Sequence, residues 1–474
     1  MVNLMRENKL KILNGIEKVR DIIVHTYGPY GRTLLLKDKN GYQINDDGYK
    51  IIKKLSFDDE YENLGLKLVL DIVEKTENEV HDCTTLATLL STSFINEIYK
   101  NNIDINSNVF VKKWENYINY VVTLMLQQVN TDINIDILQS IAKLCSKDEY
   151  IGNLIGKEIY EIGIEGELLI EESNNDETYI IRQEGYVLKD YFFESKEYQN
   201  IKLLLIKENI NSLIPFLNLL KESKKKNQPL LIVAFNYNND IYEDIIKLND
   251  SGYQILLYKL RGSKNMQQET MEDLSIITHS IIMNMNTLHN IAFEELIEIS
   301  NLKIVNNSII IPIVSSIIDL PSNLSSRRKA KILGKYSTLF VGGLSKSQME
   351  EKKSRIEDAI NSCFNVLKYG YVLGSGKALF NLSNNLKAQD SVEEIIINTL
   401  KIPFLTLLSN SGITLNDKLS LTEDEGIDLS SHEIISLKEH QIFDCVYGII
   451  RALLNASGLV YTIIHLYDAK IIEK

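Results

Sequence analysis

The strongest constraint on the fold is a pattern of apolar residues that changes twice along the chain. Residues 1–129 carry apolar side chains mainly at helical spacing, and this spacing returns from Gln348 onward. Between these ends, helical patterns alternate with short apolar runs of strand length, namely residues 201–208, 228–236, 253–260 and 307–318. Such alternation predicts a compact sheet flanked by helices, and hence an α/β domain inserted into a helical one. The periodicity does not by itself show that the two helical ends meet.

The helical ends contain clear local signals. Asn40-Gly41 lies between two apolar stretches, and this pair favours a tight hairpin turn because both residues tolerate positive φ. Residues 64–73 and 86–98 follow with amphipathic or apolar patterns that predict two successive helices. Near the other end, Gly370 is the predicted C-cap of a long helix.

Composition narrows the class of protein. The formal net charge of −13, from 64 acidic and 51 basic residues, argues against nucleic acid as the main partner, because phosphate binding needs a basic face. No run approaches the ~18–20 uninterrupted apolar residues of a membrane span, and the start of the chain resembles no export peptide. The seven histidines are scattered, and the four cysteines form no Cys-x-x-Cys pair. Free thiols suit a reducing soluble compartment, the cytoplasm or an organelle matrix or stroma.

Asp82 stands in the sequence His-Asp-Cys-Thr-Thr, directly before an apolar run. One interpretation is helix capping, in which Asp82 or Thr84 accepts hydrogen bonds from the amides of the first turn. The other is a nucleotide site, in which amides and hydroxyls face phosphate and Asp82 holds a metal ion. The choice depends on the rest of the chain.

Other short motifs combine Gly, Asp and Ser or Thr. They are Thr-Tyr-Gly-Pro-Tyr-Gly-Arg at 26–32, Ile-Asn-Asp-Asp-Gly at 44–48, Arg-Ile-Glu-Asp-Ala at 355–359 and Tyr-Val-Leu-Gly-Ser-Gly-Lys-Ala-Leu at 371–379. A single Gly-x-Gly is weak evidence, since it more often ends or begins a helix than holds a phosphate.

In this order and spacing, the motifs resemble those of the group I chaperonins, the GroEL family. The resemblance covers nearly the whole chain and is most specific at residues 341–379, with a further match at 442–457. It implies a multidomain α+β fold of three parts. A helical equatorial ATP-binding domain would span 1–129 and 369–474, a small intermediate domain 130–184 and 337–368, and an inserted α/β apical domain for substrate binding 185–336.

The resemblance also assigns roles around ATP, Mg²⁺ and K⁺. Asp82 would coordinate magnesium, while Asp47 and Asp358 would orient or activate the attacking water. The remaining nucleotide contacts would come from the phosphate residues Gly28, Pro29, Thr84 and Thr85, the potassium neighbour Thr26, and Gly374, Ser375, Gly376 and Asp444 at the ribose and base.

The implied function is ATP-dependent capture of non-native polypeptides and their enclosure for folding. The partners would be copies of the chain in a heptameric or double heptameric ring, or a mixed ring, and a GroES-type co-chaperonin. The residues expected to bind clients are Tyr191, Phe192, Phe193, Tyr242, Ile245, Ile246, Met271 and Leu274.

Several positions depart from the family pattern. His81 and Cys83 replace glycines on either side of the magnesium aspartate, Leu86 replaces a threonine, Asp46 replaces a lysine and Ser375 replaces a glycine. A Cβ at His81 and Cys83 would crowd the triphosphate. The alternative is therefore a degenerate subunit with weak or no ATP hydrolysis, acting as a structural or client-binding member of a mixed ring. A stand-alone metabolic enzyme lacks support, since no Walker loop and no dinucleotide fingerprint are present.

Overall fold

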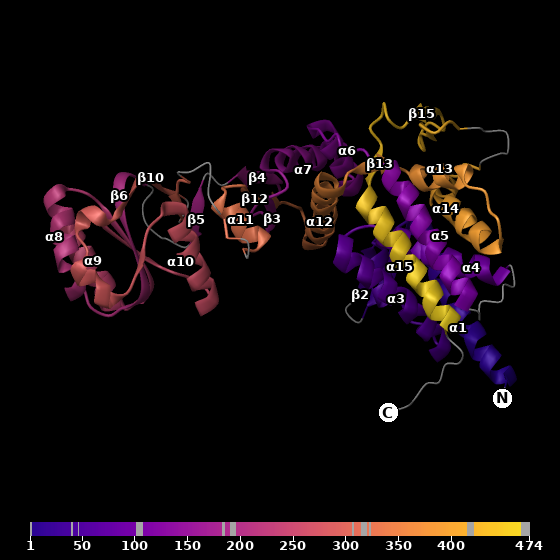
Figure 1. Cartoon of the computed structure of the whole chain (residues 1–474), viewed down its shortest axis with the longest axis horizontal. Coiled ribbons are helices and arrows are strands. Elements are labelled where there is room, and N and C mark those ends of the chain that lie inside the picture. The colour runs from indigo at the N-terminus through magenta and orange to yellow at the C-terminus, as the bar shows by residue number, and fades with distance from the viewer. Residues whose placement is uncertain are drawn as a thin grey trace. The chain divides into compact units, whose positions relative to one another are not determined.

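The computed structural model divides the chain into two compact units (Figure 1). Unit 1 combines Met1–Ile164 with Gly343–Lys474, and unit 2 is the continuous segment Glu165–Gly342. The structure describes residues 2–38, 41–45, 47–100, 108–182, 185–189, 196–305, 308–313, 320–321, 324–414 and 421–465. The two ends of the chain therefore fold together. The three-domain division remains a prediction.

Unit 1 is mainly helical. Its N-terminal segment contains α1 (Val2–Ile23), the short 3-10 turn η1 (Val24–Thr26), β1 (Leu34–Asp38), β2 (Gly41–Asn45), α2 (Gly48–Lys54), α3 (Glu60–Val80), α4 (Thr84–Lys100), α5 (Asn108–Gln127), α6 (Ile135–Ser146) and α7 (Glu149–Ile162). Its C-terminal segment contains α12 (Lys346–Tyr369), β13 (Tyr371–Leu373), α13 (Lys377–Asn385), α14 (Ser391–Asn410), β14 (Glu425–Ile427), β15 (Ile434–Ser436), β16 (Phe443–Cys445) and α15 (Val446–His465).

One hydrophobic core joins the two segments of unit 1. Leu90 of α4 and Leu453 of α15 are buried in the same cluster, with further side chains from α1, α3, α5, α13 and α14. Polar contacts also cross between the segments, since the Asn455 amide donates to the Glu79 carboxylate over 2.9 Å. Among the described helices, α15 is long and apolar enough over Val446–Ile464 to cross a membrane, but 56% of this stretch is buried inside the protein. We interpret it as a core helix.

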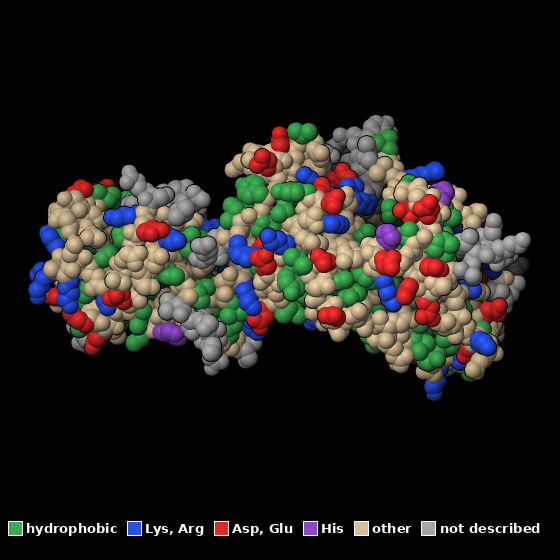
Figure 2. Space-filling model, turned by 90° about the horizontal axis from the view of Figure 1, so that it is seen from above, with side chains coloured by type: hydrophobic (Ala, Val, Ile, Leu, Met, Phe, Trp, Pro, Cys, Tyr) green, Lys and Arg blue, Asp and Glu red, His purple; other side chains and the backbone are tan. Residues whose placement is uncertain are grey.

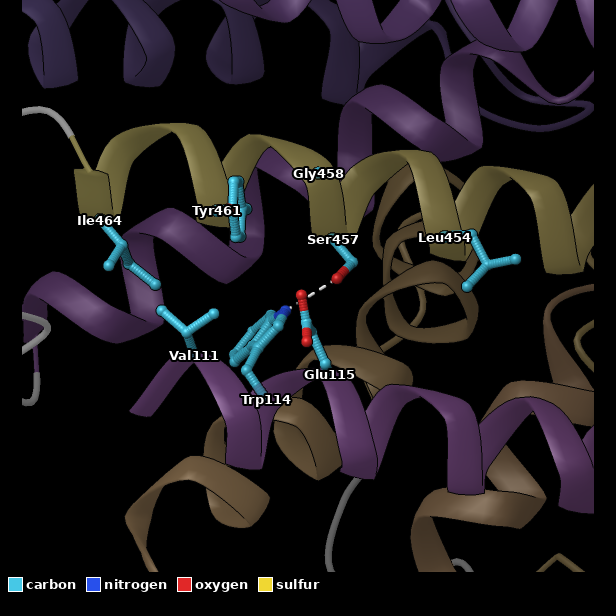
Figure 3. A pocket seen from close by; sticks show the side chains of 8 residues that line it. All are labelled: Val111, Trp114, Glu115, Leu454, Ser457, Gly458, Tyr461 and Ile464. Atoms are coloured by element: carbon cyan, nitrogen blue, oxygen red, sulfur yellow. Dashed lines mark hydrogen bonds between the residues drawn. The ribbon is translucent and has the colours of Figure 1, made fainter. Parts of the chain in front are cut away.

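A small groove lies between α5 and α15 (Figure 3). Its volume is about 250 Å³, and it is lined by Val111, Trp114, Glu115, Leu454, Ser457, Gly458, Tyr461 and Ile464. The Trp114 indole N–H donates to the Ser457 hydroxyl over 2.8 Å, so the buried ring has its polar atom satisfied.

Unit 2 is an α/β unit. It contains β3 (Glu167–Glu172), β4 (Tyr179–Arg182), β5 (Tyr186–Lys189), β6 (Lys196–Ile210), η2 (Ile214–Phe216), α8 (Leu217–Lys226), β7 (Leu230–Tyr237), α9 (Asn239–Asp250), β8 (Ile255–Lys259), α10 (Lys264–Thr278), β9 (Ile282–Met283), η3 (Met285–Asn290), η4 (Phe293–Glu295), β10 (Ile297–Val305), β11 (Ser308–Ile311), α11 (Ser326–Ile332) and β12 (Tyr336–Val341). The larger sheet has the order β5-β11-β10-β6-β7-β8, with β9 paired to β6, and the smaller has the order β3-β12-β4.

The larger sheet is covered on both faces. Successive residues of β6 point to opposite sides, so Leu203 and Leu205 belong to one core cluster and Leu204 and Ile206 to another. Helices α8 and α9 contribute to the second cluster, and α10 contributes to the first. This arrangement explains why the strand is continuously apolar rather than alternating.

The structure confirms the main elements expected from the sequence. β1 and β2 pair antiparallel, with Leu34 opposite Asn45 and Asp38 opposite Gly41, as the hairpin prediction requires. Asn40 lies outside the described residues. The helix over residues 86–98 is part of α4, and Gly370 caps α12 with φ +86°. Three of the four predicted strands correspond to β6, β7 and β8. The fourth, predicted over 307–318, corresponds to β11 only at residues 308–311; residues 312–313 are not in a strand, and residues 307 and 314–318 lie outside the described part.

Candidate active site

Asp82 lies in the tight turn between α3 and α4. The residue that flanks α4 is Cys83, whose carbonyl accepts the first helical bond from Ala87 N–H over 2.9 Å. His81 and Cys83 both take left-handed backbone conformations, with φ of 58° and 63°. The hydrogen bonds that the structure gives the Asp82 carboxylate come from Cys83 N–H, Ser362 and Cys145, not from the second or third amide of α4. The capping interpretation of Asp82 is therefore not supported.

The Asp82 carboxylate is held on both oxygens. Oδ1 accepts from the Cys83 N–H at 2.5 Å, and Oδ2 accepts from the Ser362 hydroxyl at 2.6 Å, with the Cys145 thiol 3.9 Å from the same oxygen. Burial raises the pKa of Asp82, and the nearby Asp47 carboxylate raises it further, while these hydrogen bonds oppose the rise.

Asp47 and Asp358 come to the same place from distant parts of the chain. Asp47 is the N-cap of α2, where its carboxylate accepts from the Tyr49 and Lys50 amides at 2.9 and 3.3 Å. Asp358 lies on α12, where burial raises its pKa well above the usual range and the carboxylates of Asp82 and Asp47 raise it further. The structure thus brings the three predicted acids together.

A fourth acid, Glu77 on α3, joins this group. Burial raises the pKa of Glu77, and the carboxylates of Asp47 and Asp82 add to the effect. The sequence reasoning missed Glu77, although it stands five residues before Asp82 at the end of the same helix. Among the described residues, no three His, Cys, Asp or Glu side chains converge so closely that they alone would hold a metal ion.

The predicted phosphate residues Thr84 and Thr85 lie at the start of α4, close to the start of α2. A Cβ on Gly48 would lie 2.6 Å from the Thr85 hydroxyl, so only glycine allows the two helix ends to approach this closely. Thr84 is buried as the first residue of α4. Thr26 is also buried, and its hydroxyl donates to the Ile23 carbonyl over 2.9 Å.

The turn after α1 contains Gly28 and Pro29. Gly28 has φ +88°, and a Cβ there would lie 2.1 Å from a methyl group of Leu407. Pro29 is exposed in a turn that the Gly31 N–H closes by donating to the Gly28 carbonyl over 2.9 Å. This backbone therefore has a fixed shape that a substituted residue would disturb.

Asp444 and the Gly-Ser-Gly turn lie side by side on β13, β16 and the start of α13. Val372 and Asp444 are paired across the two strands, and the Gly376 N–H donates to the Asp444 carboxylate. Ser375 and Gly376 both have positive φ. Burial raises the pKa of Asp444 to about 7, and the Asp82 carboxylate contributes to the shift. Asp444 therefore belongs to the same site as Asp82.

Tyr27 was missed by the sequence reasoning. Burial raises the pKa of its phenol, and the nearby Asp444, Cys83 and Asp82 raise it further, so the phenol lies close to the acids of the site. Its position immediately before Gly28 was the available signal.

The side chain of Cys83 packs against Gly448 of α15. A Cβ on Gly448 would lie 2.6 Å from the Cys83 sulfur, so the thiol packs against a residue that has no side chain. His81 is exposed. Leu86 is buried in the core of unit 1, and Asp46 lies outside the described residues.

The predicted client-binding residues are not all at the surface. Ile245, Met271 and Leu274 are buried in the cores that flank the larger sheet, so the prediction that they form an exposed surface is wrong. Tyr242 is half-buried, and Ile246 is 40% exposed. Tyr191, Phe192 and Phe193 lie outside the described residues.

Two exposed apolar residues on the same side of the sheet were missed. Ile214, in η2, is 73% exposed, and Leu217, the first residue of α8, is 46% exposed. Phe216 of this segment and Ile245 of α9 belong to one core cluster, so the two helices cover the same face of the sheet. The exposed apolar residues of unit 2 thus include Leu217 on α8, whereas Met271 and Leu274 of α10 are buried.

The family model and the curated relatives that match this sequence are all chaperonins. The sequence profile of the TCP-1/cpn60 chaperonin family matches residues 19–229 and 242–472. Two curated relatives, each named chaperonin GroEL, come from Aster yellows witches'-broom phytoplasma (strain AYWB) and Onion yellows phytoplasma (strain OY-M). Each is 26% identical over 457 residues, which covers 87% of this chain and 85% of the relative.

Solved structures show the same fold. A group III chaperonin in the open state aligns with a TM-score of 0.71 at 16% identity, covering 99% of this chain and 100% of that one. The chaperonin gp146 of the Pseudomonas aeruginosa bacteriophage EL, crystallised in the presence of ATP-BeFx, aligns with a TM-score of 0.66 at 17% identity and 98% coverage of both chains. The overall architecture is therefore the multidomain, GroEL-like α+β fold that the sequence predicts.

Proposed function

This chain belongs to the TCP-1/cpn60 chaperonin family, whose members are ATPases, and we propose that it hydrolyses ATP to capture non-native polypeptides and enclose them in a ring. The observation that carries the proposal is the convergence of Asp47, Asp82 and Asp358 in unit 1. These acids come from both ends of the chain, yet Asp47 raises the pKa of Asp82, and both raise the pKa of Asp358. Phosphoryl transfer to water needs charge neutralisation and an oriented nucleophile, which such acids supply.

The residues at this site fit a hard divalent cation. Four carboxylates repel one another there, so a cation would relieve the repulsion, and oxygen donors are the ligands that Mg²⁺ prefers. We assign Asp82 as the magnesium ligand, with nucleotide phosphates completing the coordination. Magnesium, when bound, would neutralise charge on the phosphates. Asp47 and Asp358 would orient the attacking water, and Thr26 would lie near a potassium ion.

The rest of the nucleotide would lie along the same site. Amides at the start of α4, with Thr84, Thr85, Gly28 and Pro29, would bind the phosphates, because a helix N-terminus favours anions. The ribose and base would lie against Asp444 and the turn Gly374–Gly376, and the proximity of Tyr27 to Asp444 and Asp82 supports the phenol as a further contact.

Steady-state phosphate release tests the ATPase. Asp358→Asn keeps the size of the side chain but removes its ability to ionise and accept a proton, and a role in water activation predicts a decrease of about 10²–10⁴-fold in turnover. Asp240→Asn, which changes an exposed acid on α9, is the matched control and should leave turnover unchanged. Equal turnover in the wild type and Asp358→Asn would rule out the proposed site.

Client capture would use the exposed apolar residues of α8 and α9. Ile214 lies in η2, and Leu217 is the first residue of α8. Tyr242 and Ile246 are four residues apart, so they lie on one side of α9. Such a surface would bind non-native chains or the mobile loop of a GroES-type co-chaperonin. Ile214→Ser with Ile246→Ser should abolish co-sedimentation of an acid-denatured test protein.

The control for client capture is Ile281→Ser. Ile281 is 76% exposed but follows α10, outside the proposed surface. If this variant loses capture to the same extent as the double variant, the surface on α8 and α9 is not specific.

Ring assembly is proposed from the family. A heptamer, a double heptamer or a mixed ring would appear in negative-stain images of the purified protein, taken with and without ATP.

All four cysteines are free thiols, which supports a reducing compartment such as the cytoplasm. On the face drawn in Figure 2, acidic and basic side chains are interspersed, which gives no support to a nucleic-acid partner.

The second candidate function is a degenerate subunit of a mixed ring. It is favoured by the left-handed backbone at His81 and Cys83, which costs free energy for any residue with a Cβ. Restoring glycine at both positions distinguishes the two functions. A large gain in ATP affinity would favour the degenerate subunit, and an unchanged, already tight affinity would favour the active ATPase.

A further inference from the structure

We propose that Ser362 is a positioning residue that ties helix α12 to the magnesium ligand Asp82 and thereby sets the magnesium dependence of nucleotide binding. The inference rests on the proposed function, because it assigns Asp82 the same role. It concerns a residue that lies outside the motifs singled out from the sequence.

The first observation is the position of Ser362 on α12. It follows Asp358 by four residues, so the two side chains lie on the same side of the helix, one turn apart. Ser362 is 2% exposed, and its hydroxyl donates to Asp82 Oδ2 over 2.6 Å. An O–H···O⁻ bond of this length is in the range of strong, charge-assisted hydrogen bonds.

The second observation is that the contact belongs to a polar stripe on α12. Ser354, Asp358, Ser362 and Asn365 recur at intervals of four, four and three residues. Ser354 accepts from the Lys50 ammonium at 2.7 Å, and this ammonium also lies 3.4 Å from Asp47 Oδ2.

At the other end of the stripe, the Asn365 amide donates to the Val80 carbonyl over 3.3 Å, at the end of α3. The stripe thus contacts the elements that carry Asp47 and Asp82, and Asp358 lies between these contacts. Because Asn365 and Ser362 hold the backbone and the carboxylate of the same turn, any displacement of α12 changes the surroundings of Asp82.

The third observation is that hydrogen bonds to both oxygens fix the orientation of the Asp82 carboxylate. Oδ1 is fixed by the Cys83 N–H, and Oδ2 faces Ser362, with the Cys145 thiol as a second, weaker neighbour from α6. Outer partners of this kind orient metal ligands, and their removal commonly lowers metal affinity by about 10–100-fold. Of the two side chains that donate to Oδ2, Ser362 makes the shorter contact.

The test compares ADP binding with saturating Mg²⁺ and with EDTA, by calorimetry on the full-length protein. The ratio of the two dissociation constants measures the contribution of magnesium. In Ser362→Ala this ratio should fall about tenfold or more, while ADP affinity in EDTA changes less than threefold. Ser362→Thr keeps the hydroxyl and should restore most of the ratio.

Ser354→Ala is the matched control, because it makes the same change on the same stripe without touching Asp82. It should keep the wild-type ratio. A wild-type ratio in Ser362→Ala overturns the inference, and so does a higher ratio, which would mean that the hydroxyl competes with magnesium. Equal losses in Ser362→Ala and Ser362→Thr would also overturn it, since the hydroxyl would not be responsible.

If Ser362→Ala does not fold, Cys145→Ala removes the other donor to Oδ2 and should lower the ratio about two- to fivefold, and an unchanged ratio overturns the inference. If Mg²⁺ does not raise the ADP affinity of the wild type, the proposed magnesium site is wrong. If Mg²⁺ raises the ADP affinity of the wild type and of Ser362→Ala equally, only the role of Ser362 is wrong.

Discussion

The buried carboxyl of Asp444 should make the stability of the protein depend on pH. Burial and the nearby Asp82 carboxylate raise its pKa from an ordinary 3.8 to about 7. A raised pKa means that the folded state favours the protonated carboxyl more than the unfolded state does. The stabilising contribution is therefore complete below about pH 4 and is lost as the pH rises to about 7.

Asp444→Asn replaces the carboxyl by a neutral group that can still accept from the Gly376 N–H. Each pKa unit corresponds to about 1.4 kcal/mol. Relative to Asn, the wild type should therefore be less stable by about 1.5 kcal/mol at pH 5 and by about 4 kcal/mol at pH 8. The difference between the two proteins should widen by about 2–3 kcal/mol over this range.

Urea unfolding of the nucleotide-free proteins at pH 5 and pH 8 measures the difference. Groups that do not interact with Asp444 titrate equally in both proteins and cancel in the comparison. The control is Asp240→Asn, for which the difference from wild type should be the same at both pH values. A difference between wild type and Asp444→Asn that stays constant from pH 5 to pH 8 would refute the reasoning.

Three other perturbations have expected outcomes. Asp273→Ala should lower the unfolding free energy of unit 2, measured in urea, by about 3–5 kcal/mol, because the buried carboxylate pairs with Arg328 at 2.6 Å and accepts from Tyr186 at 3.0 Å. The exposed pair of Asp424 with Lys438 is the control, and Asp424→Ala should cost less than about 1 kcal/mol. Gly28→Ala should destabilise by about 1–2 kcal/mol and weaken ADP binding, because its φ is +88° and Leu407 fills the space; wild-type affinity in an ADP titration would contradict this. Trp114→Phe should cost about 1–3 kcal/mol in thermal unfolding, since Ser457 loses its donor and the smaller ring leaves a gap, and Ser457→Ala should cost less than Trp114→Phe.

Much of the fold could be predicted from local signals. The apolar pattern gave α4, β6 and β7 because buried elements need apolar side chains at the period of a helix or strand. The capping glycine gave the end of α12 because Gly370 adopts positive φ there. These signals depend only on residues close in sequence.

The client surface was harder to predict. Met271 and Leu274 lie on an apolar helix face, but periodicity does not say whether a sheet covers that face, and here the larger sheet does. Ile214 and Leu217 lie around a proline at the start of a short helix, where no amphipathic pattern marks them. Exposure is a property of tertiary packing.

The acidic site was predicted only through the order of its motifs. Asp47, Asp82 and Asp358 could be named because each belongs to a recognisable stretch. Ser362 could not, because a serine in the middle of a helix is common, although its spacing from Asp358 was visible. Hydrogen bonds across elements become apparent only when the elements are in place.

The division of unit 1 between the two ends of the chain has a consequence for synthesis. A ribosome releases Asp47 and Asp82 early, but Asp358 and Asp444 emerge only after the whole of unit 2 has been translated. Unit 2 is continuous and can complete its sheet while translation is still under way. A nascent polypeptide should therefore be unable to hold a nucleotide, so that occupancy by ATP reports that translation has passed Asp444 and reached α15.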